Sequence, residues 1–274
     1  MTFFEKSNII NSEFYTENQN KMIANYHTHT TRCNHASGSE REYIESAIKS
    51  GLTTLGFSDH TPMPFPPTHF SGYRMRLDET KEYIDTINAL REEYKGKIHI
   101  KIGFEVEYFP ALFDALMLHL SDYEYDYLIL GQHFNENEYD SEHYNGIPTD
   151  NEKILERFYS QMLEAWDTGK FSYIAHPDLL KFTGDEEIYR KHTRNFCQAA
   201  AERGILLEIN VLGITLDRHY PQSIFWDIAA ECGCTAIIGF DAHIPNQLEN
   251  KASYEKARKI AESRGITLIE SLDI

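Results

Sequence analysis

Short apolar segments alternate with helical segments along almost the entire chain, and this alternation limits the fold more than any other feature of the sequence. The helical segments carry capping signals, such as Ser39 followed by Glu42 at the start of one and Gly51 at its end. The segments with strand character lie near residues 22–27, 53–58, 98–104, 126–131, 172–176, 205–210 and 235–240. The helical segments lie near residues 40–50, 78–95, 110–120, 151–168, 186–203, 221–232 and 251–264. Strict alternation predicts parallel strands joined by right-handed crossovers, so we expect an α/β fold of seven βα units.

The same pattern indicates one domain. No linker rich in Gly, Pro or Ser divides the sequence, so residues 22–274 are expected to form a single domain. Residues 1–21 are polar and Asn-rich without periodicity, and we predict that they form an N-terminal extension outside the core. Residues 267–269 are either an eighth strand or a closing segment. The acidic stretch 135–151 is expected to be a long loop that either shapes access to a site or is simply solvated.

Acidic residues outnumber basic ones, which argues against several classes of partner. The chain has 26 Lys and Arg against 43 Asp and Glu, a formal charge of −17. We therefore expect neither nucleic acid nor an anionic membrane surface as a partner. No stretch approaches the roughly 20 apolar residues that span a bilayer, and the first residues lack the pattern of a signal peptide, so we expect a cytoplasmic protein. The sequence gives no indication of an oligomeric state.

The four cysteines are too few for a disulfide framework in a chain of this length. They are Cys33, Cys197, Cys232 and Cys234. Cys232 and Cys234 lie close together, but one Cys-x-Cys without a second pair is a weak zinc motif. We interpret these two as small buried residues that pack ahead of a strand.

Seven of the 13 histidines fall at or just after the carboxyl end of an expected strand. Because the carboxyl ends of parallel strands meet at one edge of a sheet or barrel, these side chains are expected to converge. Two acids, Glu105 and Asp241, end strands that are otherwise mainly apolar, where a charge is costly to bury unless it is paired or bound to a metal. Each residue alone is compatible with a hydrogen-bonded group at a barrel rim, whereas the whole set favours a metal centre. The histidines are His27, His29, His35, His60, His133, His176 and His243.

The ligand types indicate the kind of metal. Imidazoles with a few carboxylates suit zinc, iron or manganese, whereas calcium and magnesium prefer oxygen ligands. Nine donors exceed what one ion needs. The sequence therefore predicts two or three metal ions, with Glu105 able to bridge two of them.

The order of these motifs resembles the polymerase and histidinol phosphatase (PHP) superfamily, and more narrowly its monofunctional histidinol-phosphatases of histidine biosynthesis. The resemblance covers about residues 22–272. It implies a distorted TIM-like barrel of seven βα units, in a single domain, with three divalent transition metal ions (zinc, iron or manganese). It rests on Tyr26-His27-Thr28-His29, Cys33-Asn34-His35, Gly56-Phe57-Ser58-Asp59-His60, Gly103-Phe104-Glu105, Gly131-Gln132-His133, Ala175-His176-Pro177-Asp178, Leu207-Glu208-Ile209-Asn210 and Asp241-Ala242-His243.

The resemblance also implies which residues hold each ion. The first ion would be bound by His27, His29, Glu105 and Asp241, the second by Glu105, His133 and His176, and the third by His35, His60 and His243. Asp59 matches the Asp-His pair of the family, and we expect it to orient His60. The candidate catalytic residues are Asp59, Glu105, Asp241 and His243.

The implied activity is hydrolysis of a small phosphomonoester. The leading hypothesis is a histidinol-phosphatase, which converts L-histidinol phosphate and water to L-histidinol and phosphate by in-line attack of a metal-bound hydroxide. The leaving group is protonated either by a metal-bound water or by an acid near the site. The candidate residues for binding the phosphate are Lys181, Arg218, Arg74 and Arg76.

Other functions remain as alternatives. A nuclease of the same superfamily is disfavoured by the net charge and the lack of a basic stripe. A protein-tyrosine phosphatase would use the same metal set. An amidohydrolase would need a metal-bridging lysine after a middle strand, and no lysine stands at such a strand end. A non-enzymatic metal-binding module is the last alternative, although open coordination positions in a cleft favour catalysis.

Overall fold

The structure is a computed structural model that describes residues 22–139 and 144–274. Eight parallel strands form one sheet in sequence order from β1 to β8. The predicted N-terminal extension, residues 1–21, lies outside the described residues. The strands are β1 (Ala24–Asn25), β2 (Thr54–His60), β3 (His99–Val106), β4 (Tyr127–Leu130), β5 (Tyr173–Ile174), β6 (Leu206–Asn210), β7 (Thr235–Gly239) and β8 (Thr267–Leu268).

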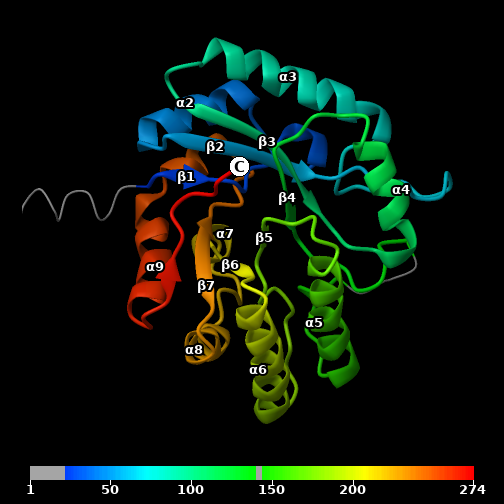
Figure 1. The fold of residues 1–274 in the computed structure, drawn as a ribbon, viewed down its shortest axis with the longest axis vertical. Coiled ribbons are helices and arrows are strands. Elements are labelled where there is room, and N and C mark those ends of the chain that lie inside the picture. The colour runs from blue at the N-terminus through cyan, green and yellow to red at the C-terminus, as the bar shows by residue number, and fades with distance from the viewer. Residues whose placement is uncertain (1–21, 140–143) are drawn as a thin grey trace, which may run out of the picture.

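Helices connect successive strands and lie outside the curled sheet, as Figure 1 shows for α3 to α6, α8 and α9. Short 3-10 helices, labelled η, add turns between them. This arrangement confirms the α/β fold expected from the alternation and the distorted TIM-like barrel that the family resemblance implies. The helices are η1 (Thr31–Cys33), α2 (Glu40–Ser50), η2 (Leu77–Glu79), α3 (Thr80–Glu93), α4 (Pro110–Leu120), α5 (Glu152–Trp166), α6 (Glu186–Glu202), α7 (Val211–Thr215), α8 (Ser223–Glu231), η3 (Pro245–Glu249) and α9 (Lys251–Glu262).

Alternation along each strand divides the core into two layers. On β4, Leu128 and Leu130 point outward into the large cluster between sheet and helices, whereas Tyr127 and Ile129 belong to a small cluster inside the barrel. The ring of Tyr127 fills the interior next to Gly103, where a Cβ atom would lie 2.6 Å from it. Side chains that face inward at the carboxyl ends of the strands therefore share one enclosed space above this small apolar cluster.

The barrel closes between the first and seventh strands. Thr28 and Ala242 form a parallel bridge just beyond β1 and β7, where His29 N donates to Ala242 O at 2.9 Å. Near the other end of β7, the short strand β8 pairs with it from Thr267 to Leu268. Of the two predictions for residues 267–269, the eighth strand is therefore the confirmed one. The closure brings the segment after β1 beside the segment after β7.

Some local predictions differ from the structure. The strand expected near residues 172–176 covers only Tyr173–Ile174. The first strand is only two residues long, because the Asn25 side chain accepts from Phe240 N at 2.9 Å and donates to His27 O at 3.1 Å, which takes over contacts that a longer strand would make. The turn after β6 contains the unpredicted helix α7, whose start is capped by Asn210 Oδ1 accepting from Gly213 N at 2.9 Å. None of the described helices is long and apolar enough to cross a membrane.

Candidate metal centre

Four side chains converge at the carboxyl end of the barrel to form the most compact part of the site. His27 Nε2 lies 3.5 Å from both Glu105 Oε2 and Asp241 Oδ1. His29 Nε2 lies 3.5 Å from Glu105 Oε2 and 3.1 Å from Asp241 Oδ1. Four ligand atoms placed tetrahedrally at about 2.1 Å from one ion are about 3.4 Å apart. The spacing of these atoms therefore matches a shared tetrahedral ion.

Several buried histidine nitrogens at the site lack a hydrogen-bond partner. The buried Nε2 atoms of His27 and His29 have no hydrogen-bond partner, and neither does the buried Nδ1 atom of His176. A buried polar atom without a partner is costly unless something else satisfies it. The Nε2 atoms of His27 and His29 face the carboxylates of Glu105 and Asp241 across such a space, which fits a transition metal ion.

Glu105 extends the site toward a second position. Its Oε1 atom lies 2.9 Å from His176 Nε2 and 3.7 Å from His133 Nε2. Its Oε2 atom lies 3.0 Å from His60 Nδ1, and His60, Glu105 and His133 form a triad whose ligand atoms lie within 4.8 Å of one another. With one oxygen toward each group of histidines, the carboxylate has the geometry of a bridge between two ions.

A third group of donors lies at the edge of the site. The ligand atoms of His35, His60 and His243 lie within 4.8 Å of one another, and His243 Nε2 is 3.0 Å from His35 Nε2. Backbone carbonyls hold the other nitrogen of two rings, because His35 Nδ1 contacts Cys33 O at 2.7 Å and His243 Nδ1 contacts Asp241 O at 2.9 Å. The structure thus brings together all nine ligands expected from the sequence, and their assignment to particular ions stays a prediction.

Burial and contacts between neighbours decide which of these groups carry charge. Burial alone would lower the pKa of His27, but carboxylates led by Glu208 raise it to about 10. Burial would raise the pKa of Glu105, but imidazoles led by His133 hold it well below its usual range. The pKa of Asp241 is low because imidazoles led by His27 outweigh burial. Protons on imidazoles therefore compensate the buried carboxylates, and a divalent cation would replace those protons.

Backbone geometry at the site is unusual in two places. His176 and Asp241 both adopt positive φ angles, of 30° and 52°, two residues after the ends of β5 and β7. Non-glycine residues rarely occupy this region, and such strain gathers at functional sites. The turn aims each side chain back over the barrel mouth toward the other donors.

The structure gives a role to Glu208, which the sequence analysis included in a family motif without assigning it a function. Glu208, inside the barrel on β6, accepts from His27 Nδ1 at 2.7 Å, from His176 N at 3.0 Å and from Asn210 Nδ2 at 2.9 Å. It thereby fixes which nitrogen of His27 faces the site. Gly239 on the neighbouring strand makes room for it, because a Cβ atom there would lie 1.8 Å from Glu208 Oε1. A charged residue in the middle of an apolar strand was the available signal.

Asp59 contacts a different ring from the one we expected. Its Oδ1 atom lies 3.4 Å from His29 Nδ1, and its contact with His60 is to the backbone N–H, at 2.9 Å. Its Oδ2 atom accepts from the backbone N–H and the hydroxyl of Thr30. Asp59 therefore supports the ring of His29, and its carboxylate makes no contact within 4.0 Å with the ring nitrogens of His60 in the described structure.

A cavity of about 580 Å³ opens above the donors, with Asp241, His60 and His243 in its floor. The loop after β4 contributes Tyr144 and Ile147 to its lining. Of the two roles predicted for the segment 135–151, shaping access to a site and simple solvation, the first therefore applies to part of it. Residues 140–143 of this segment lie outside the described residues. The rest of the lining consists of His35, Tyr73, Glu107, His133, Phe134, Leu212, Leu216, Arg218, Tyr220 and Gln247.

Of the four cations predicted to bind phosphate, Arg218 is the one that lines this cavity. Its guanidinium group donates to Tyr220 Oη at 2.8 Å and remains exposed. Arg76 lies at the surface and pairs with Asp78, and Lys181 is half-buried outside the lining. These placements favour Arg218, and the other two remain predictions that the cavity does not support.

Arg74 has a structural partner instead of a free guanidinium group. It is 2% exposed and donates to Glu107 Oε1 at 2.7 Å and to Glu138 Oε2 at 2.6 Å. Glu107, a residue missed from the sequence, also accepts from Phe134 N at 3.0 Å and lies 3.5 Å from His133 Nδ1. Arg74 therefore neutralises a carboxylate that lies beside a candidate ligand histidine, and its guanidinium group is already paired with two carboxylates.

Comparison with known proteins places the site in a family. The PHP domain model matches residues 25–211. A probable histidinol-phosphatase of Deinococcus radiodurans is 30% identical over 241 residues, which cover 82% of this chain and 88% of the relative. A histidinol-phosphatase of Bacillus subtilis is 35% identical over 114 residues, which cover 39% of this chain and 42% of the relative.

A solved structure shares the fold. The crystal structure of histidinol phosphate phosphatase from Lactococcus lactis, complexed with zinc, L-histidinol and phosphate, has a TM-score of 0.71 to this chain at 23% identity. The match covers 90% of this chain and 95% of that one. With the family match over residues 25–211 and the full set of donors at the barrel mouth, the chain belongs to the PHP domain family.

Proposed function

We propose that the protein is a metal-dependent phosphomonoesterase that hydrolyses L-histidinol phosphate to L-histidinol and phosphate. The observation that carries this proposal is the convergence of nine histidine and carboxylate donors below a cavity of about 580 Å³. That volume is in the range of small-molecule sites, which is about 300–1,000 Å³. The curated relatives named as histidinol-phosphatases support the choice of substrate.

Three divalent ions of zinc, iron or manganese fit the donor sets. His27, His29, Glu105 and Asp241 would hold the first, Glu105, His133 and His176 the second, and His35, His60 and His243 the third. When bound, such ions supply positive charge for a phosphate dianion and activate water at neutral pH. The structure of the relative from Lactococcus lactis contains zinc, L-histidinol and phosphate as bound ligands.

The residues of this chain then position the substrate. Arg218 offers an exposed guanidinium group at the cavity wall, where it suits a phosphate oxygen. Leu212, Leu216 and Ile147 give the same cavity an apolar wall for the organic part of the ester. Phosphoryl transfer depends mainly on position and on neutralised charge, so a donor set with a cation and apolar side chains in the same cavity suits this reaction.

Glu208, Asp59 and Glu107 act behind these groups. Two of these carboxylates hydrogen-bond to the far nitrogen of a histidine, Glu208 at 2.7 Å for His27 and Asp59 at 3.4 Å for His29. This keeps the protonated nitrogen of each ring away from the cavity and the other nitrogen toward it. Glu107 lies 3.5 Å from His133 Nδ1 without a hydrogen bond to it, so Glu208 and Asp59 are the positioning residues.

Steady-state kinetics on a small set of phosphoesters tests the proposal. The set contains L-histidinol phosphate, a phosphotyrosine peptide, a simple sugar phosphate and a phosphodiester, and the metal content of the same preparation is measured. We expect kcat/KM for L-histidinol phosphate to exceed the others by at least about tenfold, or about 1.4 kcal/mol. A tenfold preference for the phosphotyrosine peptide would make the protein a protein-tyrosine phosphatase, and a preference for the diester would favour a nuclease.

A further inference from the structure

Tyr220 is a buried tyrosine in the cavity wall whose hydroxyl group none of the metal positions uses. It lies in the turn between α7 and α8, is 3% exposed and lines the cavity. Its ring lies beside the ring of His176, with centroids 6.2 Å apart. Of the three tyrosines in the lining it is the most buried, since Tyr73 is 54% exposed and Tyr144 is half-buried. The Tyr220 ring therefore forms the part of the wall next to a donor of the second metal position.

The turn after α7 holds this ring in place. Arg218 N donates to Gly213 O at 2.8 Å, which folds the chain back onto α7. Gly213 leaves the space for Tyr220, because a Cβ atom at Gly213 would lie 2.3 Å from Tyr220 O and 2.7 Å from Tyr220 Cδ2. Such close packing leaves the ring little freedom to turn. The hydroxyl group at the end of the ring therefore has a defined position.

The hydroxyl group accepts one hydrogen bond and has no acceptor for its own hydrogen. Arg218 Nη1 donates to Tyr220 Oη at 2.8 Å, and Arg218 Cζ lies 5.9 Å from the centre of the Tyr220 ring. Among residues 22–139 and 144–274, no oxygen or nitrogen atom accepts from this hydroxyl group. A donor without an acceptor is costly at a buried position. The free hydrogen therefore indicates an acceptor that a ligand in the cavity would supply.

The pair of Arg218 and Tyr220 matches the chemistry of a phosphate group. A tyrosine hydroxyl group has an ordinary pKa of about 10 and donates at neutral pH, and a guanidinium group is always charged. The pair thus presents one O–H and several N–H donors from a single short segment. A phosphate monoester has oxygens that can accept from both side chains, and hydrogen bonds to an ionised acceptor are the stronger kind.

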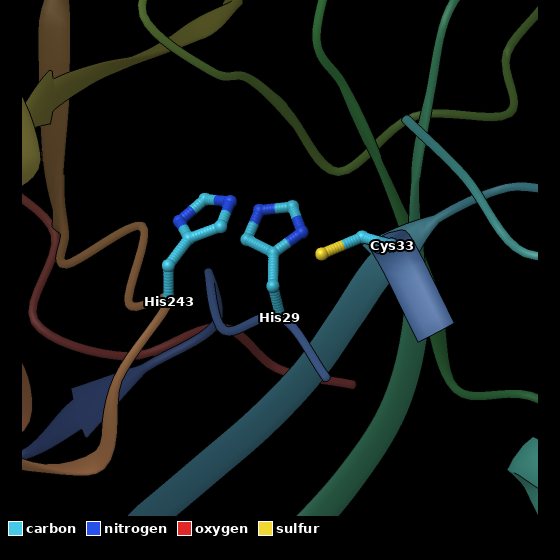
Figure 2. Close-up of side chains that lie close together, drawn as sticks. All are labelled: His29, Cys33 and His243. Atoms are coloured by element: carbon cyan, nitrogen blue, oxygen red, sulfur yellow. The ribbon is translucent and has the colours of Figure 1, made fainter. Parts of the chain in front are cut away.

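The side chains at another edge of the metal centre pack against one another instead. Figure 2 shows the His29 and His243 rings together, with the sulfur of Cys33 on the other side of His29. The two rings are stacked, with centroids 4.1 Å apart. His29 and Cys33 are 0% exposed and do not belong to the cavity lining. Neither of these two side chains can therefore contact a phosphate in the cavity, whereas Arg218 and Tyr220 line it.

We propose that the Tyr220 hydroxyl group donates a hydrogen bond to a phosphate oxygen of the substrate, from a position that Arg218 fixes. The two side chains together hold the phosphate for in-line attack and neutralise part of its charge. The hydroxyl group keeps its proton, and no covalent bond to the tyrosine forms. The inference rests on the proposed phosphomonoesterase activity and does not depend on which alcohol the ester carries.

The substitution Tyr220→Phe tests the inference, because it keeps the ring and removes the hydroxyl group alone. In the metal-loaded full-length protein, kcat/KM should fall by about 10- to 100-fold, which corresponds to the loss of a hydrogen bond to a charged group. The fall should be the same for L-histidinol phosphate and p-nitrophenyl phosphate, because both present the same phosphate group. The affinity for inorganic phosphate, measured by calorimetry, should fall by about tenfold.

Tyr254→Phe is the matched control. Tyr254 is also buried, and its Oη atom also accepts from an arginine, Arg258 Nη1 at 3.5 Å, but it lies on α9 and does not line the cavity. This substitution should leave kcat/KM and the affinity for phosphate unchanged. Equal values for Tyr220→Phe and Tyr254→Phe would overturn the inference.

Two other results would give the hydroxyl group a different role and would also overturn the inference. A fall that occurs with L-histidinol phosphate and disappears with p-nitrophenyl phosphate, whose leaving group needs no proton, would assign the hydroxyl group to protonation of the leaving group. Loss of bound metal from Tyr220→Phe would assign it to support of His176. If the wild type bound inorganic phosphate but hydrolysed neither ester, the proposed function would fail, and the phosphate affinity of Tyr220→Phe would still decide the role of Tyr220.

Discussion

Gly131 leaves the space in which the bridging carboxylate of Glu105 lies. Gly131 directly follows β4, and a Cβ atom there would lie 1.9 Å from Glu105 Oε1. Ordinary van der Waals contact begins at 3.4 Å, so in Gly131→Ala this oxygen has to move by about 1.5 Å, the difference between the two distances. Metal–ligand distances tolerate only about 0.2 Å. The substitution should therefore remove Glu105 from both metal positions without a change of charge.

The expected loss is large. A misplacement of about 1 Å at a reacting centre costs about 100-fold in rate, so kcat/KM of Gly131→Ala should fall by at least about that factor. The metal content, measured by mass spectrometry on the purified protein, should fall in the same variant. Gly72→Ala is the matched control, because no atom lies within 4 Å of a Cβ atom at Gly72. If Gly131→Ala kept the metal content and the kcat/KM of Gly72→Ala, the bridging position of Glu105 would be refuted.

Three further predictions follow from contacts around the centre. Arg74→Ala leaves two buried carboxylates unpaired and should lower the free energy of unfolding by about 3–5 kcal/mol in urea titrations. Arg76→Ala, at the surface, should change the free energy of unfolding by less than about 0.5 kcal/mol. Equal effects of the two substitutions would contradict the buried pairing of Arg74. Glu208→Gln should weaken metal affinity by about 10- to 100-fold in competition with a chromophoric chelator, and unchanged affinity would exclude a positioning role for this carboxylate. Burial lowers the pKa of His27 but neighbouring carboxylates raise it to about 10, so below that pH the ring must release its proton when metal binds. Calorimetry in buffers of different ionisation enthalpy should detect the release of at least one proton per chain at neutral pH, and metal affinity should rise with pH. Metal binding without proton release would contradict a protonated His27.

Much of the fold and the donors could be predicted from the sequence because both follow from local rules. Alternation places a strand end before each helix, and parallel strands bring those ends together, so His133 and His176 could be placed from their positions after apolar segments alone. Glu105 could be found in the same way, because a charge at the end of an apolar strand needs a partner. These inferences use only the position of each residue in its own segment and require no knowledge of which segments lie close together in space.

The partners of the donors could not be predicted, because they depend on contacts between distant segments. Glu208 contacts His27 across 181 residues of sequence, and Arg74 meets Glu138 across 64. Nothing local distinguishes Arg74, which is buried and paired, from Arg218, which lines the cavity. The orientation of Asp59 toward the ring of His29 likewise depends on how β2 lies beside the segment after β1.

Stepwise reconstitution of the metal-free protein tests the central claim most directly. Phosphate release from L-histidinol phosphate is measured as zinc or manganese is added, with the bound metal per chain determined at each step. We predict no turnover without metal and a rise in activity that ends at three ions per chain. Full activity in the metal-free protein, or a maximum reached at one ion per chain, would contradict a polynuclear phosphatase centre.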